Sequence, residues 1–231
     1  MIYVIPYFWK SLKLLTNPVL RPFLLIPLLI NVVLYSMALF FGYWYLDHWV
    51  AQIIPTWLHF LTWLIYPVFV VSFCLVGFFT FSLLANLIAA PFYAKLAAKT
   101  LVVINAPQLL TIEQSAIQIW RAELNRLRYS LTHTLPLLVL FVIPVVNLIA
   151  PMIWFGFSAW CVALEYFAFP LENRGILFPN QKELLKKMRF SALSFGGLVT
   201  LGQSLPVINI VVAPIAIIAA TLYIEDNAPQ N

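Results

Sequence analysis

Long uncharged apolar stretches alternate with short charged ones along this chain, and the alternation predicts helices that cross a membrane. Residues 22–46 and 61–94 contain no Asp, Glu, Lys or Arg. Each stretch is longer than the roughly 20 apolar residues that a helix needs to cross the hydrocarbon core of a bilayer. We therefore predict one long transmembrane helix in each stretch.

A proline-asparagine repeat interrupts two further apolar stretches, residues 135–169 and 191–223. Its first copy, residues 143–151, reads Ile-Pro-Val-Val-Asn-Leu-Ile-Ala-Pro, and its second, residues 205–214, reads Leu-Pro-Val-Ile-Asn-Ile-Val-Val-Ala-Pro. A partial copy, Asn-Leu-Ile-Ala-Ala-Pro, occupies residues 86–91. Proline removes an amide donor and clashes with the preceding turn, so each complete copy should break a helix from its first proline to its second.

The interrupted stretches are compatible with two architectures. In one, two complete spans are joined by a turn outside the membrane; in the other, two shorter helices form a re-entrant hairpin. The first arm, Leu135–Ile143, would rise about 14 Å as a helix, roughly half the hydrocarbon thickness. A turn in water normally carries Gly, Asp, Ser or charge, and this one is apolar apart from Asn147. We favour re-entrant hairpins for both stretches.

Three polar segments complete the predicted fold. Residues 1–16 combine aromatic residues with lysine, as an interfacial amphipathic helix does. Residues 95–130 predict a cytoplasmic helical region, in which Thr111 and Gln114 have the spacing of a capping box. Residues 170–190 predict a second cytoplasmic segment. The fold class is thus all-α: an integral membrane protein with two long transmembrane helices, two re-entrant (half-penetrating) helical hairpins and cytoplasmic or interfacial amphipathic helices.

Composition supports a single membrane domain over residues 1–231. Hydrophobic residues make up 63% of the chain and charged residues 9%, against roughly 25% charged residues in soluble proteins. The two cysteines, Cys74 and Cys161, lie in apolar stretches, where a small buried side chain is a better interpretation than a disulfide or a metal ligand.

The distribution of positive charge predicts the orientation. All 13 Lys and Arg residues lie within 10–21, 95–128 and 174–189. Positive residues mark the cytoplasmic side, so both termini should be cytoplasmic and the segment 47–59 should lie outside. The net charge of +5 follows from this bias, and we expect no nucleic-acid partner.

The uncharged polar residues in the apolar stretches are the candidates for a pore. Broken helices and amide side chains can coordinate an ion at membrane depth without a fixed charge. The predicted lining residues are Asn86, Asn147, Asn209, Gln203 and Ser204. No catalytic, metal or cofactor motif occurs in the sequence, and an enzyme would need an ionisable cluster around His133 and Glu165.

Two further features favour an anion. Asn17 and Arg21 flank the start of the first long helix, where free amides and a guanidinium can bind an anion, although Arg21 can equally bind lipid phosphate. On the cytoplasmic side, a group of charged residues can line a vestibule that attracts anions, or can be solvated or lipid-facing. These residues are Arg121, Glu123, Arg126 and Arg128.

In the order and spacing of several segments, the chain resembles the CysZ family of bacterial inner-membrane sulfate permeases over nearly its whole length. The segments that carry the resemblance are residues 17–23, 26–31, 85–92, 143–151, 157–160 and 205–214. The resemblance implies sulfate uptake for sulfur assimilation and cysteine biosynthesis, a multi-pass inner-membrane location, contact with membrane lipid, and a homo-oligomer.

The resemblance also implies a sulfate site. In the family a Gly-Leu-Arg-like turn before the first long helix binds sulfate through backbone amides and arginine. Here the turn reads Val19-Leu20-Arg21 and is followed by Pro22. Three hypotheses follow: a sulfate permease, for which Val19, Leu20 and Arg21 bind the ion; a non-transporting oligomeric scaffold or assembly factor; and a membrane-embedded enzyme. We favour the permease.

Overall fold

The computed structural model describes residues 4–53, 62–104, 106 and 115–227. Every regular element in these ranges is helical, in agreement with the predicted all-α class. Two of the described helices have the length and apolar composition of a membrane span, within Arg21–Tyr45 and Ala150–Asn173. The contacts divide the chain into one unit of Met1–Phe23 with Tyr93–Asn231, and another of Leu24–Phe92.

The unit Leu24–Phe92 consists of the greater parts of α2 (Arg21–Ile53) and α3 (Thr62–Val103). The rings of Tyr43 on α2 and Tyr66 on α3 lie 5.6 Å apart, centroid to centroid. Most of the described side chains of α2 are exposed, and nearly all are apolar, which suits a surface that faces lipid. The predicted span 22–46 thus falls within α2, and residues 62–94 of the predicted span 61–94 fall within α3, while Leu61 lies outside the described residues.

Both helices run past the predicted ends of the spans. Helix α2 has 33 residues and continues beyond Leu46 to Ile53, so the predicted outer loop begins later than expected. Helix α3 has 42 residues and passes through Pro91 without a break before it ends at Val103. The residues after Ala94 continue α3 because Leu96 and Ala97 are good helix formers, and both are fully buried.

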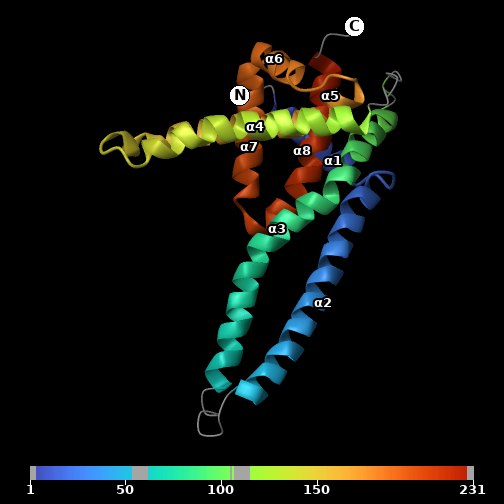
Figure 1. The fold of residues 1–231 in the computed structure, drawn as a ribbon. Helices are drawn as coiled ribbons and strands as arrows, with labels where there is room; N and C mark the ends of the chain where they lie inside the picture. Colours follow the sequence, from blue (N-terminus) through green and yellow to red (C-terminus); the bar gives the residue numbers. More distant parts are fainter. Residues whose placement is uncertain (1–3, 54–61, 105, 107–114, 228–231) are drawn as a thin grey trace. The chain divides into compact units, whose positions relative to one another are not determined.

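In the other unit, helix α5 (Ala150–Asn173) packs against α7 (Arg189–Gln203) and α8 (Pro206–Asn227). Figure 1 shows α7 and α8 as two antiparallel helices joined by a tight turn. Tyr166, Phe167 and Phe195 are fully buried where the three helices meet. The rings of Phe167 and Phe195 lie 4.5 Å apart.

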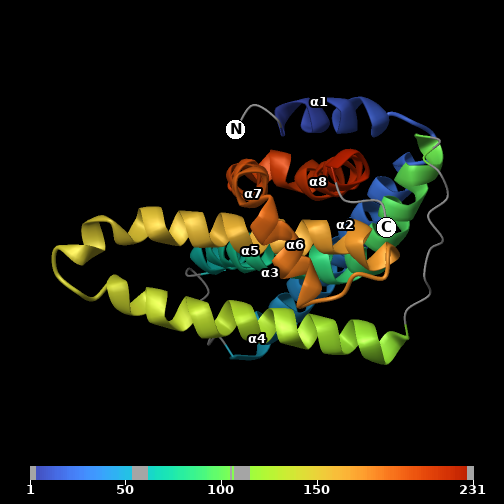
Figure 2. The ribbon, with the colours of Figure 1, turned by 90° about the horizontal axis from the view of Figure 1, so that it is seen from above.

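Helix α1 (Ile5–Leu14) covers the outer side of α7 and α8, as Figure 2 shows. The Tyr7 ring meets the Tyr223 ring edge-on at 5.3 Å, and Phe8 lies 5.1 Å from Phe195. The segment predicted as an interfacial helix is therefore helical, and part of its aromatic face packs on protein.

Small residues bring the helices of this unit close together. A Cβ atom on Gly196 would lie 1.8 Å from the carbonyl oxygen of Ala159, so α7 runs directly against the backbone of α5. A Cβ atom on Gly202 would lie 2.8 Å from Cγ2 of Val212. Helices approach this closely only where one of them lacks a side chain.

Helix α4 (Ala116–Leu140) and α5 form a second antiparallel pair (Figure 2). The turn between them contains η2 (Val146–Leu148), and Val145 before it adopts a φ of 70°. A β-branched residue rarely takes a positive φ. The predicted capping box at Thr111 and Gln114 lies outside the described residues. In the structure Ser115 donates its N–H to Oε1 of Gln118 at 3.2 Å where α4 begins.

The helix breaks differ from the prediction in extent. In the first copy of the repeat the break spans residues 141–149, and Pro151 is the second residue of α5. In the second copy it is confined to Ser204 and Leu205, because Pro206 starts α8 and Pro214 lies inside it. A proline in the first turn loses no hydrogen bond, so Pro151 and Pro206 can start helices. The expected break therefore ends near Pro151 in the first copy, and the expectation that it extends to Pro214 in the second copy was wrong.

The predicted nine-residue first arm was also wrong. Helix α4 has 25 residues and runs through Pro136, so it rises about 38 Å, more than the hydrocarbon thickness of roughly 30 Å. Helix α7 has 15 residues and rises only about 22 Å. The first half of α4 carries four charged residues, so its apolar end remains short, and α7 is also too short to cross the hydrocarbon. The re-entrant arrangement of both pairs stays a prediction.

Candidate functional site

The turn predicted to bind sulfate is organised by Asn17. Its side-chain Oδ1 accepts the N–H of Val19 at 2.9 Å. Its backbone carbonyl accepts the N–H of Leu20 at 3.0 Å and that of Arg21 at 3.1 Å. Pro18 and Pro22 have no amide to donate. All three amides of the turn are therefore used within the turn itself.

The side chains of this turn point in different directions. Leu20 is completely buried and anchors the turn, whereas Val19 and Arg21 are exposed. Because the amides are already donated to Asn17, the guanidinium of Arg21 is the group that the turn offers to an anion in this conformation.

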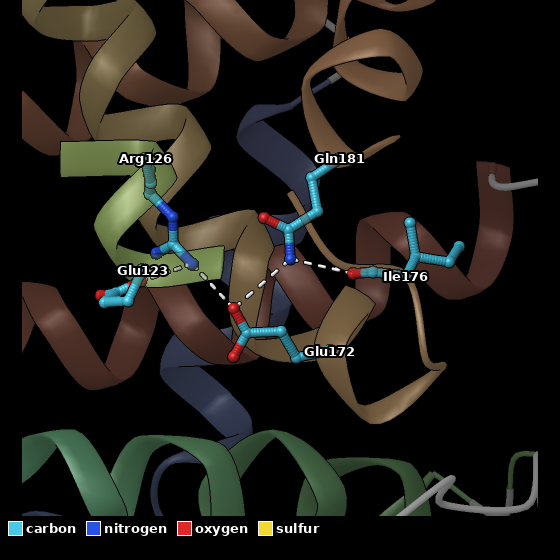
Figure 3. Close-up of polar contacts among 5 residues, drawn as sticks. All are labelled: Glu123, Arg126, Glu172, Ile176 and Gln181. Atoms are coloured by element: carbon cyan, nitrogen blue, oxygen red, sulfur yellow. Dashed lines mark hydrogen bonds and ion pairs between the residues drawn. The ribbon is translucent and has the colours of Figure 1, made fainter. Parts of the chain in front are cut away.

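The second predicted group contains a buried ion network (Figure 3). Nη2 of Arg126 on α4 lies 2.7 Å from Oε1 of Glu172 on α5 and 2.8 Å from Oε2 of Glu123. Gln181 on α6 (Asn180–Lys187) donates from Nε2 to the carbonyl oxygen of Ile176 at 2.9 Å and reaches Glu172 at 3.4 Å. The network thereby joins α4, α5 and α6.

The charge of this network does not suit an anion. Two carboxylates, Glu123 and Glu172, face the single guanidinium of Arg126, so the ionised cluster carries one net negative charge. The side chain of Arg126 is 10% exposed and that of Glu172 is 18% exposed, so water screens the pair little. Arg126 and Glu172 therefore connect α4 to α5, while Glu123 is exposed on the same helix as Arg126. The predicted vestibule residues Arg121 and Arg128 are also exposed.

A second ion pair ties the end of α5 to α8. Arg174, directly after α5, pairs with Glu225 near the C-terminal end of α8, and both side chains are largely buried. Acids at the polar ends of apolar helices are thus matched to nearby arginines, which removes the cost of isolated charge.

The predicted pore-lining residues lie at the turns of the two helix pairs. Gln203 is held by its Nε2 donating to the hydroxyl of Tyr166 at 2.8 Å, and Ser204 donates to the carbonyl oxygen of Thr200 at 2.9 Å. Asn147 is exposed in the α4–α5 turn, and Asn209 is half-buried in α8. The side chain of Asn86 lies outside the described residues.

Gln203, Ser204 and Asn209 lie around the α7–α8 turn, whereas Asn147 lies in the α4–α5 turn. Figures 1 and 2 both show the α4–α5 turn well separated from the α7–α8 turn. The sequence also gave no sign of Tyr166, a buried hydroxyl that orients Gln203, because the two residues are far apart along the chain and meet only through the α5–α7 contact.

Of the two residues named for a catalytic cluster, His133 has its ring nitrogen engaged on its own helix. Nδ1 of His133 lies 2.8 Å from the carbonyl oxygen of Tyr129 on its own helix. Within the residues that the structure describes, no three His, Cys, Asp or Glu side chains lie close enough to hold a metal ion. The polar groups of this unit are thus arranged mainly in pairs that connect helices.

Comparison with known proteins places the chain in a family. A family profile described as sulfate transporter CysZ/Etoposide-induced protein 2.4 matches residues 7–214. The chain is 37% identical over 235 residues to sulfate transporter CysZ of Pseudomonas fluorescens, which covers 97% of this chain and 94% of the relative.

Two further relatives show the same degree of similarity. Sulfate transporter CysZ of Pectobacterium atrosepticum is 35% identical over 224 residues, covering 93% of this chain and 82% of the relative. Sulfate transporter CysZ of Pseudomonas syringae pv. tomato is 37% identical over 226 residues, covering 94% of this chain and 89% of the relative. The chain therefore belongs to the family described as sulfate transporter CysZ/Etoposide-induced protein 2.4.

Proposed function

We propose that this protein is a sulfate transporter of the bacterial inner membrane, with both termini in the cytoplasm, and that it supplies sulfate for cysteine biosynthesis. The observation that carries the proposal is the similarity to relatives named sulfate transporter CysZ along nearly the whole chain. The apolar helices suit a membrane protein, and the confinement of Lys and Arg to three segments supports the orientation.

We place the first contact of sulfate at Arg21. The guanidinium is exposed at the start of α2, and its planar fork matches the oxygen geometry of a tetrahedral dianion. A sulfate ion at this place could also recruit the amides of Val19 and Leu20 if it displaced Asn17 as their acceptor. No metal, cofactor or catalytic step is part of this proposal.

The α7–α8 pair is the better candidate for a re-entrant hairpin. Its first helix rises about 22 Å, so its turn at Ser204 and Leu205 would lie within the hydrocarbon if α7 starts at the cytoplasmic surface. Irregular backbone is stable there only where protein or water covers it. A water-filled path beside this turn would meet that requirement.

A shared path for the predicted lining residues would require a homo-oligomer. The two turns with the lining candidates lie apart within one chain (Figure 2), so a common path would need turns from more than one copy. In such an assembly Asn147, Asn209, Gln203 and Ser204 could line one route, as uncharged dipoles that bind an ion weakly enough to release it.

Sulfate uptake by cells tests the proposal. In a bacterial strain that lacks its own sulfate uptake systems, the intact protein should restore accumulation of radiolabelled sulfate and growth on sulfate as sole sulfur source. Growth on cysteine should not depend on sulfate uptake, so it serves as the control for viability. If membrane-inserted protein restored neither accumulation nor growth, the proposed function would be wrong.

The hairpin is tested separately by labelling. Cys74 and Cys161 are first replaced by alanine, and a single cysteine is placed at Leu205, in the α7–α8 turn. A bulky membrane-impermeant maleimide added from outside should not label it, whereas a cysteine at Asp47 should react. Ready labelling at Leu205 would show that α7 and α8 emerge from the membrane.

A further inference from the structure

A second cationic feature lies on α4, outside the ion network of Arg126. It is an open pocket of about 240 Å³ between one face of α4 and the segment that leads into α6. The residues that line it are Asn125, Arg128, Tyr129, Thr132, Phe178 and Pro179. The four residues from α4 have the spacing of a single helix face, and none of the six is acidic.

Two positive charges flank this pocket, and no acidic residue is among the residues that line it. Nζ of Lys182 lies 5.0 Å from the ring centroid of Tyr129 and 5.8 Å from that of Phe178, so the lining rings hold the ammonium by cation–π contact. Arg128 is exposed at the pocket. In the part of the chain that the structure describes, neither Arg128 nor Lys182 forms an ion pair.

The nearby acids are occupied elsewhere. Glu183, next to Lys182, accepts a hydrogen bond from Lys186 at 3.0 Å, and that bond lowers the pKa of the Glu183 carboxyl. Glu123 and Glu172 are engaged with Arg126. Glu183 also interacts with the charges of Lys182 and Lys187, so one carboxylate is shared among three lysines, and the charge around the pocket is net positive, in contrast to the neighbouring network.

An apolar surface runs along α4 beside the pocket. Its members recur every three or four residues and are exposed by 47% to 75%; we refer to them as the α4 stripe. They are Ile117, Trp120, Leu124, Leu127, Leu131, Leu135 and Leu138. Contact of such a long apolar stripe with acyl chains is favourable, whereas its exposure to water costs free energy. Arg128 follows Leu127 directly, so the charged and apolar surfaces adjoin.

We propose that the pocket binds the phosphate head group of an anionic membrane lipid, whose acyl chains lie along the α4 stripe. A phosphodiester carries a single negative charge and several acceptor oxygens, which can take charge-assisted hydrogen bonds from Arg128 and Lys182 at once. The amide of Asn125 provides a further donor. A zwitterionic lipid would fit the stripe equally but would bring an ammonium group toward two cations.

Lipid-dependent stability of the intact protein tests the proposal. Purified protein in neutral detergent is titrated with phosphatidylglycerol, and separately with phosphatidylcholine of the same acyl chains, and its melting temperature is followed. We expect phosphatidylglycerol to raise the melting temperature more. In the double variant Arg128→Gln with Lys182→Gln, at least tenfold more phosphatidylglycerol should be needed for half of the stabilisation. The melting temperature in phosphatidylcholine should stay unchanged.

Matched variants separate the pocket from general charge attraction. Arg121 lies two turns before Arg128 on the same face of α4 but does not line the pocket, and Lys187 is exposed at the end of α6. Arg121→Gln with Lys187→Gln removes the same charge and should keep the phosphatidylglycerol effect. An equal loss in this control pair would overturn the proposal.

Two other occupants would give different results. If inorganic phosphate at the same ionic strength reproduced the full stabilisation, and Arg128→Gln with Lys182→Gln abolished it while Arg21→Ala did not, the pocket would be a site for a free ion, and the lipid proposal would fail. If stabilisation followed protein concentration and a change in oligomeric mass, with no difference between the two lipids, the α4 stripe would contact a second copy of the chain instead.

Discussion

Replacement of Gly196 by alanine tests the closest helix contact in the structure. The added Cβ would lie 1.8 Å from the carbonyl oxygen of Ala159 and 2.7 Å from its carbonyl carbon. Ordinary contacts of a Cβ atom begin at about 3.4 Å, so α7 and α5 would have to separate by roughly 1.5 Å in a densely packed interior. No side-chain rotation can relieve the clash, because the opposing atoms belong to the backbone.

The expected loss of stability follows from two opposing effects. Overpacking of a well-packed interior costs typically 1–3 kcal/mol, and a backbone partner favours the upper end of that range. Alanine favours a helix over glycine by about 1 kcal/mol. The net destabilisation should therefore be about 2 kcal/mol, with the contact between α5 and α7 weakened along its length.

Two other glycines provide matched controls. A Cβ atom on Gly156 in α5 would meet no atom within 4 Å, and one on Gly197 would meet only the Phe155 ring, at 3.9 Å. Alanine at Gly156 should stabilise the protein by up to about 1 kcal/mol through helix propensity alone. Alanine at Gly197 should stabilise the protein by a similar amount, because a contact at 3.9 Å is an ordinary van der Waals distance and opposes the propensity gain little.

Reversible unfolding of the purified protein in mixed micelles of a mild detergent and dodecyl sulfate measures these differences, with loss of helical circular dichroism as the signal. Gly156→Ala and Gly197→Ala should both be at least as stable as the unaltered protein, and Gly196→Ala should be less stable than all three. If Gly196→Ala were as stable as Gly197→Ala, the packing of α7 against the α5 backbone would be refuted.

Three further predictions follow from the described contacts. Arg126→Met should lower the free energy of unfolding by about 3 kcal/mol, because it leaves the buried carboxylate of Glu172 unpaired. Glu123→Gln should change the free energy of unfolding by less than about 1 kcal/mol, because the Glu123 side chain is exposed. The same unfolding assay measures both variants, and equal losses would contradict the prediction. Tyr166→Phe removes one hydrogen bond and should cost about 1 kcal/mol, and a loss below the error of the assay would show that the bond contributes nothing. Arg21→Ala should weaken sulfate binding more than tenfold, about 1.4 kcal/mol, in isothermal titration at moderate salt, whereas Lys13→Ala should not; unchanged binding in Arg21→Ala would place the site elsewhere.

The apolar pattern predicted the helical class and the position of the first long helices, because span length and charge distribution are local properties of the sequence. It also placed helix ends close to both proline repeats. It misjudged Pro206, since a proline in a first turn has no amide that would have been bonded and can start a helix. It also missed that α8 runs through Pro214 and α4 through Pro136, where an interior proline removes one backbone hydrogen bond without ending the helix.

The site was less predictable because its contacts are long-range. Arg126 was recognised as a charged residue of a cytoplasmic helix, but its partner Glu172 lies 46 residues further along the chain, and no local pattern links the two. The sequence placed Asn17 at the start of the first long helix. Only the structure shows that the amides of the three residues Val19, Leu20 and Arg21 all donate to Asn17. The pocket beside Lys182 likewise depends on how Phe178 meets α4.

Sulfate flux into vesicles that contain only this protein tests the central claim most directly. Purified protein is reconstituted into liposomes with a neutral and an anionic lipid, and uptake of radiolabelled sulfate is compared with that of protein-free vesicles and of vesicles with equal amounts of Arg21→Ala. The account predicts uptake that saturates with sulfate concentration, far above the empty vesicles and reduced by the substitution. Uptake equal to that of empty vesicles, with folded and correctly inserted protein, would contradict it and favour a scaffold.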